Sequence, residues 1–404
     1  MKRAILILYT LVLTACGGDG GGGGGSTVVT TTPPAIPSNP TPHLVISNLA
    51  GNVKNIAVGD LNGDGLDDVV IGGWGGPGNV ANIYVLIQNA DGTLTDRTAT
   101  VLPVTNYTGS QRIFIRDFDN DGRNDIFIPG FNDGCANGCA VHSMVFWNQP
   151  GQFLQQILPE LNDSHGACVD DINNDGKLDV LVRGEPQSGT VGGVYLNNGN
   201  RSFTLNQSIV GGATCSINHE TNGNISIVTG NGNTISTYDN NLNLVASVAI
   251  ASQDPATTND LIDSVSLDVN NDGHKDFVLV FDNTSDNTKG RKEVWLNDGS
   301  GHYAYSYTID SANYNYYHYN VLSYNNMTLV YFSGANLQAT LYQLAGGQFT
   351  PYKQSDFTAM ATQVGYTPGF NWSVDVGEVY QNTGTGKLYM LQLINGALYT
   401  EEMQ

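Results

Sequence analysis

Four short acidic segments share one nine-residue pattern that suits a hard metal ion. Oxygen-bearing side chains occupy positions 1, 3, 5 and 9 of each segment, and glycine occupies position 6. Oxygen ligands at alternate positions let a short loop wrap a cation, and glycine permits the sharp turn that returns the chain. Position 7 would add a backbone carbonyl, because the side chains found there share no chemistry. The pattern predicts four Ca²⁺ sites with these ligands: Asp60, Asn62, Asp64, Leu66 and Asp68; Asp117, Asp119, Asp121, Arg123 and Asp125; Asp171, Asn173, Asp175, Lys177 and Asp179; Asp268, Asn270, Asp272, His274 and Asp276.

The residues that flank these segments indicate strands rather than helices. An EF-hand would place a bidentate glutamate at position 12, where this chain has Ile71, Ile128, Val182 and Leu279. β-Branched and aromatic runs lie on both sides of each segment, which favours a strand–loop–strand arrangement. A single such segment could be a solvated turn, but four copies in matching context argue against chance.

The acidic segments belong to a longer repeat of about 50 residues. The first three begin at residues 60, 117 and 171, and the fourth begins at 268, after a gap of nearly twice that spacing. A degenerate copy fills the gap at residues 218–226. Turns that resemble β-hairpins recur independently near Asn89, Asn148, Asn197, Asp239, Asn297, Ala345 and Asn395, and Asx-Gly is a strong hairpin signal.

About four short strands per repeat of this length are typical of a propeller blade. The sequence therefore predicts an all-β, seven-bladed β-propeller over residues 43–404. Calcium-binding loops would join the first and second strands of blades 1, 2, 3 and 5, and blades 4, 6 and 7 would be degenerate. The apolar segment 43–47 is a candidate to pair with the last blade and close the ring. Blade 7 is also predicted to hold four strands of its own, which leaves the closure open.

These blades resemble FG-GAP repeats, the calcium-binding propeller repeats of integrin α subunits, which are often labelled VCBS or FG-GAP in bacterial proteins. The resemblance covers most of residues 44–404 and is specific in blades 1, 2, 3 and 5. It implies that the matching Asp and Asn positions bind Ca²⁺. The scaffold hosts adhesins, lectins and some enzymes, so the resemblance alone does not assign a function.

The N-terminus predicts export and lipid anchoring. Lys2 and Arg3 precede an apolar stretch of about ten residues, too short for a bilayer span of about 20 residues and typical of a signal peptide over residues 1–15. The segment that ends at Cys16 resembles the lipobox of bacterial lipoproteins, with an uncleaved anchor or an ordinary secretory signal as the alternatives. Residues 16–42 form a Gly/Thr/Pro-rich linker that cannot bury a core. The expected location is the cell envelope, lipid-anchored in a bacterial outer membrane.

Charge and cysteine content agree with an exported calcium protein. The formal charge is −21, and the chain shows no basic patch that would neutralise phosphates, so nucleic acid is not an expected partner. Four cysteines besides Cys16 predict disulfides in an exported chain. Cys135 and Cys139 would clip one loop of blade 2. Cys168 and Cys215 occupy equivalent positions in successive blades and could be bridged; a cysteine metal site is the alternative.

A tyrosine-rich segment is the best candidate for ligand binding. Residues 313–320 are predicted to lie in the connection between blades 5 and 6, on the face opposite the calcium loops. Exposed tyrosine beside Asn and His can stack on sugars and bond their hydroxyls, although packing between blades explains the same residues. Trp74, predicted in a glycine-rich loop of blade 1, is a weaker candidate. The candidate ligand residues are Tyr314, Tyr316, Tyr317, His318, Tyr319 and Trp74.

Sequence reasoning favours a binding module over an enzyme. The histidines are scattered, and none lies in a nucleophile elbow or an HExxH motif. The predicted function is a calcium-stabilised, membrane-anchored binding or adhesion module for a glycan or a surface protein. A polysaccharide-degrading, lyase-like propeller and an envelope scaffold component are the alternatives.

Overall fold

The computed structural model describes most of the chain after residue 42. The chain divides into Met1–Ala35 and Ile36–Gln404, and every described residue belongs to the second unit. The predicted signal peptide, Cys16, the linker, Cys135 and Cys139 lie outside the described residues. The described residues are 43–49, 52–74, 81–104, 106–107, 109, 112–131, 141–162, 164, 166–182, 192–207, 209, 214–230, 233–250, 259–283, 290–310, 316–334, 338–356, 377–382, 386–394 and 396–403.

Seven antiparallel sheets of four strands make up this unit, as the sequence predicts. Blades 1 to 3 are formed by β2 (Asn52–Gly59), β3 (Asp68–Trp74), β5 (Tyr84–Gln88) and β6 (Leu94–Asp96); by β8 (Phe114–Arg116), β9 (Asp125–Ile128), β10 (Val141–Gln149) and β11 (Gln152–Asn162); and by β12 (Ala167–Asp170), β13 (Asp179–Val182), β14 (Gly193–Gly199) and β15 (Ser202–Asn206).

The second half of the chain repeats the same arrangement. Blades 4 to 6 are formed by β16 (Cys215–His219), β17 (Ile225–Thr229), β18 (Thr234–Tyr238) and β19 (Leu244–Ala249); by β20 (Asn259–Leu267), β21 (Asp276–Asn283), β22 (Gly290–Asn297) and β23 (Tyr303–Asp310); and by β24 (Tyr316–Tyr324), β25 (Met327–Gly334), β26 (Gln338–Ala345) and β27 (Gln348–Asp356). Blade 7 contains β28 (Gly377–Asn382), β29 (Lys387–Ile394) and β30 (Ala397–Met403), with β1 (His43–Ile46) as its fourth strand.

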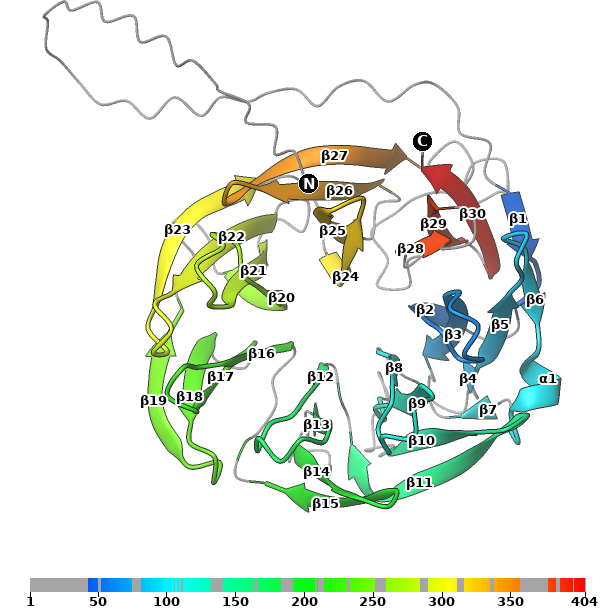
Figure 1. Cartoon of the computed structure of the whole chain (residues 1–404), viewed down its shortest axis with the longest axis horizontal. Coiled ribbons are helices and arrows are strands. Elements are labelled where there is room, and N and C mark those ends of the chain that lie inside the picture. Colours follow the sequence, from blue (N-terminus) through cyan, green and yellow to red (C-terminus); the bar gives the residue numbers. More distant parts are fainter. Residues whose placement is uncertain are drawn as a thin grey trace, which may run out of the picture. The chain divides into compact units, whose positions relative to one another are not determined.

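The first strand of each blade faces a common axis (Figure 1). Successive inner strands contact each other, for example β16 with β20 and β24 with β28, and β28 contacts β2 of blade 1. The blades therefore form a closed ring, and the sequence prediction of a seven-bladed propeller is confirmed.

The ring closes through a strand from the start of the described chain. β1 pairs with β30, with His43 opposite Thr400 and Leu44 opposite Tyr399. Among the described residues, blade 7 has three strands of its own, so the prediction of four was wrong. The hairpin near Gly396 joins the second and third strands of blade 7, whereas the matching hairpins of other blades join the third and fourth. The fourth position is thereby left for β1.

The core lies between neighbouring blades and follows from strand alternation. In β3, Val69 packs with Leu391 of blade 7, whereas Val70 packs with Ile126 of blade 2. Successive side chains of a strand point to opposite faces, so one strand supplies apolar groups to both neighbours. This explains why the central strands are continuous apolar runs rather than alternating ones.

Helical structure is almost absent from the described residues. They contain one short helix, α1 (Thr98–Val101), and a small additional sheet formed by β4 (Ala81–Asn82) and β7 (Asn106–Tyr107). No helix in this part of the chain has the length and apolar character needed to cross a membrane.

A disulfide joins the inner strands of blades 3 and 4. Cys168 of β12 and Cys215 of β16 are bonded, with their Cα atoms 5.7 Å apart, which confirms the predicted pairing. The chain between the two cysteines is about one blade long. The bridge covalently joins two inner strands that belong to different sheets.

We expect the paired substitutions Cys168→Ser and Cys215→Ser to lower the free energy of unfolding by about 2–4 kcal/mol, because the bridge restricts the unfolded chain. Urea denaturation of oxidised wild type and the double variant measures this difference. An unchanged midpoint with an unchanged slope would contradict a stabilising role for the bridge.

Candidate metal centre

All four acidic segments lie where the sequence predicts, between the first and second strands of their blades. They connect β2 to β3, β8 to β9, β12 to β13 and β20 to β21. The degenerate copy in blade 4 connects β16 to β17. The same strand–loop–strand connection therefore recurs in several blades of the ring.

Backbone conformation explains the glycine at position 6. Gly65, Gly122, Gly176 and Gly273 have φ angles of +82°, +87°, +84° and +91°. A Cβ atom at any of these positions would meet nothing within 4 Å. Backbone conformation, rather than crowding, therefore requires glycine. Position 4 also has positive φ and is occupied by glycine or asparagine, the residues that tolerate it best.

The aspartate at position 1 organises the turn by accepting backbone hydrogen bonds. One of its carboxylate oxygens accepts a hydrogen bond from the backbone N–H of the position-6 glycine. The distance is 2.8 Å both for Gly65 with Asp60 and for Gly122 with Asp117. The aspartate at position 5 accepts the N–H of position 7, for example at 2.8 Å from Leu66 to Asp64. These hydrogen bonds hold the loop in a tight turn.

The aspartate at position 9 is buried and ties the loop to the rest of its blade. Its two oxygens accept one N–H from position 2 of the loop and one from the end of the third strand. In blade 2, Phe118 donates to Asp125 at 3.0 Å and Asn148 donates at 2.8 Å. The same pair of bonds occurs in the other three blades. The side chains of Asp68, Asp125, Asp179 and Asp276 are all fully buried.

Burial raises the pKa of each position-9 carboxyl. Removal from water disfavours the charged form, and neighbouring loop aspartates add to this, although the backbone donors oppose it. The pKa of Asp68 and of Asp125 rises to about 7, and that of Asp179 rises to about 6. The pKa of Asp276 is raised by the same causes. Each site thus holds a carboxylate that a nearby positive charge would stabilise.

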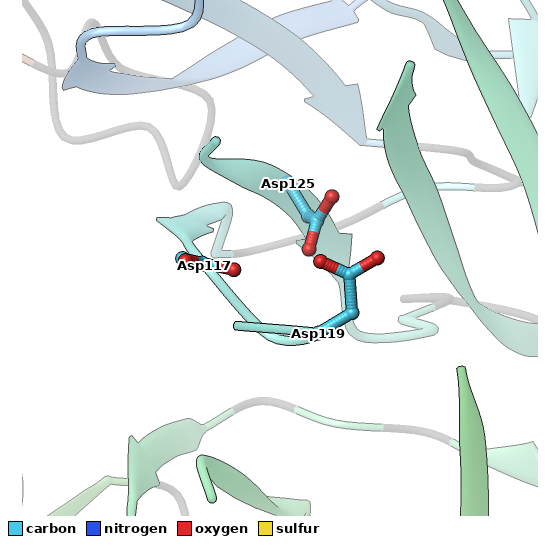
Figure 2. Close-up of side chains that lie close together, drawn as sticks. All are labelled: Asp117, Asp119 and Asp125. Atoms are coloured by element: carbon cyan, nitrogen blue, oxygen red, sulfur yellow. The ribbon is translucent and has the colours of Figure 1, made fainter. Parts of the chain in front are cut away.

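The loop of blade 2 brings three carboxylates together at positions 1, 3 and 9. Oxygens of Asp117, Asp119 and Asp125 all lie within 4.8 Å of one another. Figure 2 shows the carboxylates of Asp119 and Asp125 turned toward each other. Position 3 is an aspartate in this loop alone; elsewhere it is asparagine, which offers an oxygen without charge.

The geometry of blade 2 fits a cation. The side chain of Asp119 is only 7% exposed, and its Oδ1 atom is buried without a hydrogen-bond partner in the structure. A buried carboxylate oxygen that lacks a donor is costly unless a positive group satisfies it. Oxygen ligands clustered at this spacing match the preference of Ca²⁺.

Two arginines also contact aspartates of this loop. Arg201, from the β14–β15 turn of blade 3, donates through Nε to Asp119 Oδ2 at 2.7 Å. Arg123 donates to Asp121 within the loop. Guanidinium groups therefore offset part of the carboxylate charge in this structure, and one of them comes from the adjacent blade.

In blades 2 and 3, an asparagine at the end of the third strand bonds the loop of the preceding blade, a role that sequence reasoning missed. The amide nitrogen of Asn148 donates to the carbonyl oxygen of Leu61 in the blade 1 loop at 2.7 Å. Asn197 donates in the same way to Phe118 of the blade 2 loop at 2.7 Å. The asparagine that begins each hairpin turn was visible in the sequence. Its side chain, however, also makes this contact to the preceding blade, which the turn pattern does not indicate.

The degenerate loop of blade 4 uses a glutamate in the corresponding contact. Glu220 accepts hydrogen bonds from the hydroxyl of Tyr303 at 2.8 Å and from the amide of Asn297 at 3.0 Å, both in blade 5. This buried polar contact joins the two blades through protein groups alone.

The candidate ligand residues lie elsewhere than predicted. Tyr316, Tyr317, His318 and Tyr319 belong to β24, where Tyr319 lies opposite Phe332. The prediction of an interblade connection was wrong for them because the tyrosine run pairs with β25. Trp74 is the last residue of β3, opposite Asn52, rather than a loop residue. Of these side chains only that of Tyr319 is described, and Tyr314 lies outside the described residues.

Three of the described histidines, His142, His219 and His302, make local structural contacts. His142 bonds backbone oxygens of Leu158 and Glu160. His219 contacts Asp170, which raises the pKa of the imidazole. His302 contacts Asp298 in an exposed hairpin turn. Each imidazole therefore has a role in holding a strand or turn.

Comparisons with known proteins agree with this architecture. The family model for the FG-GAP-like repeat matches residues 60–128, which include the loops of blades 1 and 2. Cartilage acidic protein 1 of Xenopus tropicalis is 26% identical over 138 residues, which cover 32% of this chain and 20% of that protein. The chain thus matches only about a fifth of the length of that curated relative.

A solved structure resembles the whole propeller. A chain of the crystal structure of BBS1N in complex with ARL6DN, soaked with mercury, aligns with a TM-score of 0.51 at 10% identity. The alignment covers 90% of this chain and 97% of the other. At this identity the likeness concerns the fold.

The fold and the repeated loops define a seven-bladed β-propeller built from acidic strand–loop–strand repeats. The FG-GAP-like repeat matches the part of this propeller that holds its first two acidic loops.

We expect chelator-treated protein to become more stable as the pH falls from 8 to 5.5. The position-9 carboxyls have folded pKa values above the unfolded value of about 3.9, so the folded state binds more protons across this range and the free energy of unfolding falls as pH rises. The carboxyls with lowered pKa, such as Asp298 at about 2, titrate below this range.

Thermal melting at both pH values with chelator measures the effect. Added Ca²⁺ should reduce the pH dependence, because a cation and a proton would compete for the same carboxylates. A higher melting temperature at pH 8 than at pH 5.5 in chelator would contradict the account.

Proposed function

We propose that this protein is a calcium-stabilised binding or adhesion module, anchored to the bacterial outer membrane by a lipid on Cys16. Its ligand would be a glycan or another surface protein. The observation that carries the proposal is the combination of an FG-GAP-repeat propeller with four acidic loops of one geometry. The N-terminal segment supports the anchor, because a lipobox-like sequence precedes a Gly/Thr/Pro-rich tether.

In this proposal calcium is structural. In blade 2 the ligands would be Asp117, Asp119 and Asp125, which already converge, together with Asp121 and the backbone of Arg123. When bound, the ion would offset repulsion among the carboxylates. The chain's own contribution is to bring positions 1, 3 and 9 together and to exclude water from position 9. The first and second strands of each blade would then be joined across the loop.

Removal of calcium should lower the melting temperature by several degrees or more, because up to four sites bind the folded state alone. Asp119→Ala should remove one site and lower the calcium stoichiometry by one. Asp91→Ala, which removes an exposed aspartate from a hairpin turn of blade 1, is the matched control and should change neither quantity. Melting and equilibrium dialysis provide the measurements, and an identical melting temperature in chelator and in calcium would rule out the structural role.

A glycan array tests the binding function. We expect the soluble part, residues 43–404 with calcium, to bind a defined class of glycan without forming new reducing ends or unsaturated uronates. Cleavage products would overturn the binding proposal in favour of a polysaccharide-degrading enzyme. Absence of both binding and cleavage would exclude a glycan as the ligand and leave a surface protein as the proposed ligand.

A further inference from the structure

A small cavity, the axial cavity, lies among the inner strands that face the axis of the ring, and its lining residue Arg116 directly precedes Asp117 of the blade 2 loop. Its volume is about 250 Å³, and its walls come from β2, β8 with the two residues before it, β24 and β28. Ligand pockets for drug-sized molecules measure roughly 300–1,000 Å³, so this cavity suits a smaller molecule. Its polar lining consists of Asn55, Arg112, Arg116, Tyr319, Asn320 and Glu378.

Arg112 is a fixed part of the wall. Its Nη2 atom bonds Asp263 Oδ1 of blade 5 at 2.8 Å, and its guanidinium lies 5.9 Å from the ring centroid of Tyr319. The hydroxyl of Thr214 donates to the same Asp263 oxygen at 3.1 Å. This ion pair joins blades 2 and 5 across the ring and neutralises one of the two arginines.

Glu378 and Asn320 form another part of the wall. Glu378 is buried, and its Oε1 accepts the amide N–H of Asn320 at 2.7 Å and the backbone N–H of Val379 at 2.8 Å. The amide of Asn320 is thereby oriented, which fixes its position beside the cavity.

Arg116 differs from these groups because its charge has no partner in the described part of the chain. The side chain is exposed, and its hydrogen bond there runs from Nη1 to the carbonyl oxygen of Ile115 at 2.7 Å. The whole chain has 37 acidic residues against 16 lysines and arginines. The cavity also holds the carboxylate of Glu378, but this group accepts hydrogen bonds from Asn320 and Val379. In so acidic a protein, a guanidinium that lines a cavity and forms no ion pair among the described residues is positioned to bind an external anion. Its planar fork matches a carboxylate.

We propose that the axial cavity binds a small hydroxylated carboxylate, such as a sugar acid, with Arg116 as the group that binds the carboxylate. Amides of the lining can exchange hydrogen bonds with hydroxyl groups. The cavity size restricts the ligand to about one ring or a short chain. This inference is independent of the adhesive function, because it concerns a small molecule at the axis.

Isothermal titration calorimetry with D-glucuronate and D-glucose tests the proposal on the calcium-loaded protein. These sugars share a ring and hydroxyls and differ in the carboxylate. We expect glucuronate to bind at least about tenfold more tightly than glucose, and Arg116→Gln to weaken glucuronate binding at least about tenfold, because a charge-assisted hydrogen bond is lost. Added salt should weaken binding as well.

Arg97→Gln is the matched control, since it removes the same charge from an exposed position after β6 and should leave binding unchanged. Arg116→Lys keeps the charge without the fork and should retain part of the affinity. Melting temperatures of all variants should equal that of the wild type. The proposal is overturned by equal binding of both sugars, by no binding, by phosphate binding as tightly as glucuronate, or by unchanged affinity in a folded Arg116→Gln variant.

Discussion

The buried aspartate at position 9 is the interaction on which the rest of the acidic loop depends. It ends the loop, begins the second strand and accepts backbone donors from the loop and from the third strand, as Asp125 does with Phe118 and Asn148. A carboxylate in this position fixes three segments of one blade at once. It is also a group that burial disfavours in its charged form. The need for a compensating positive charge is therefore built into the blade.

That constraint extends from one blade to the next. Asn148 donates its backbone N–H to Asp125 of its own blade and its side-chain amide to Leu61 of the preceding loop. Arg201 reaches back from blade 3 to Asp119 in blade 2. The loops of blades 1, 2 and 3 thus form a connected series. The blade 3 loop also contacts blade 4, where Asn174 bonds the carbonyl oxygen of Gly223. Glu220 of blade 4 in turn contacts blade 5 through Tyr303 and Asn297.

Local patterns made much of this architecture predictable. The loop spacing and the Asx-Gly hairpins placed the blades, and Cys168 and Cys215 were correctly paired because they occupy equivalent inner strands. Features that depend on distant segments were predicted only in part. The candidate pairing of residues 43–47 with the last blade is confirmed by β1, whereas the prediction of four strands within blade 7 itself was wrong. Tyr319 lies in an inner strand, and the Arg112–Asp263 ion pair joins residues that are close only after the ring closes.

If the four acidic loops are calcium sites, each should hold one ion. Native mass spectrometry of the purified chain in calcium, and again after exchange into chelator, counts bound ions directly. We expect four Ca²⁺ ions per chain, one for each loop that has a carboxylate at positions 1, 5 and 9. A chain that binds no calcium under these conditions would contradict it, and the buried aspartates would then have to be balanced by protons and arginines alone.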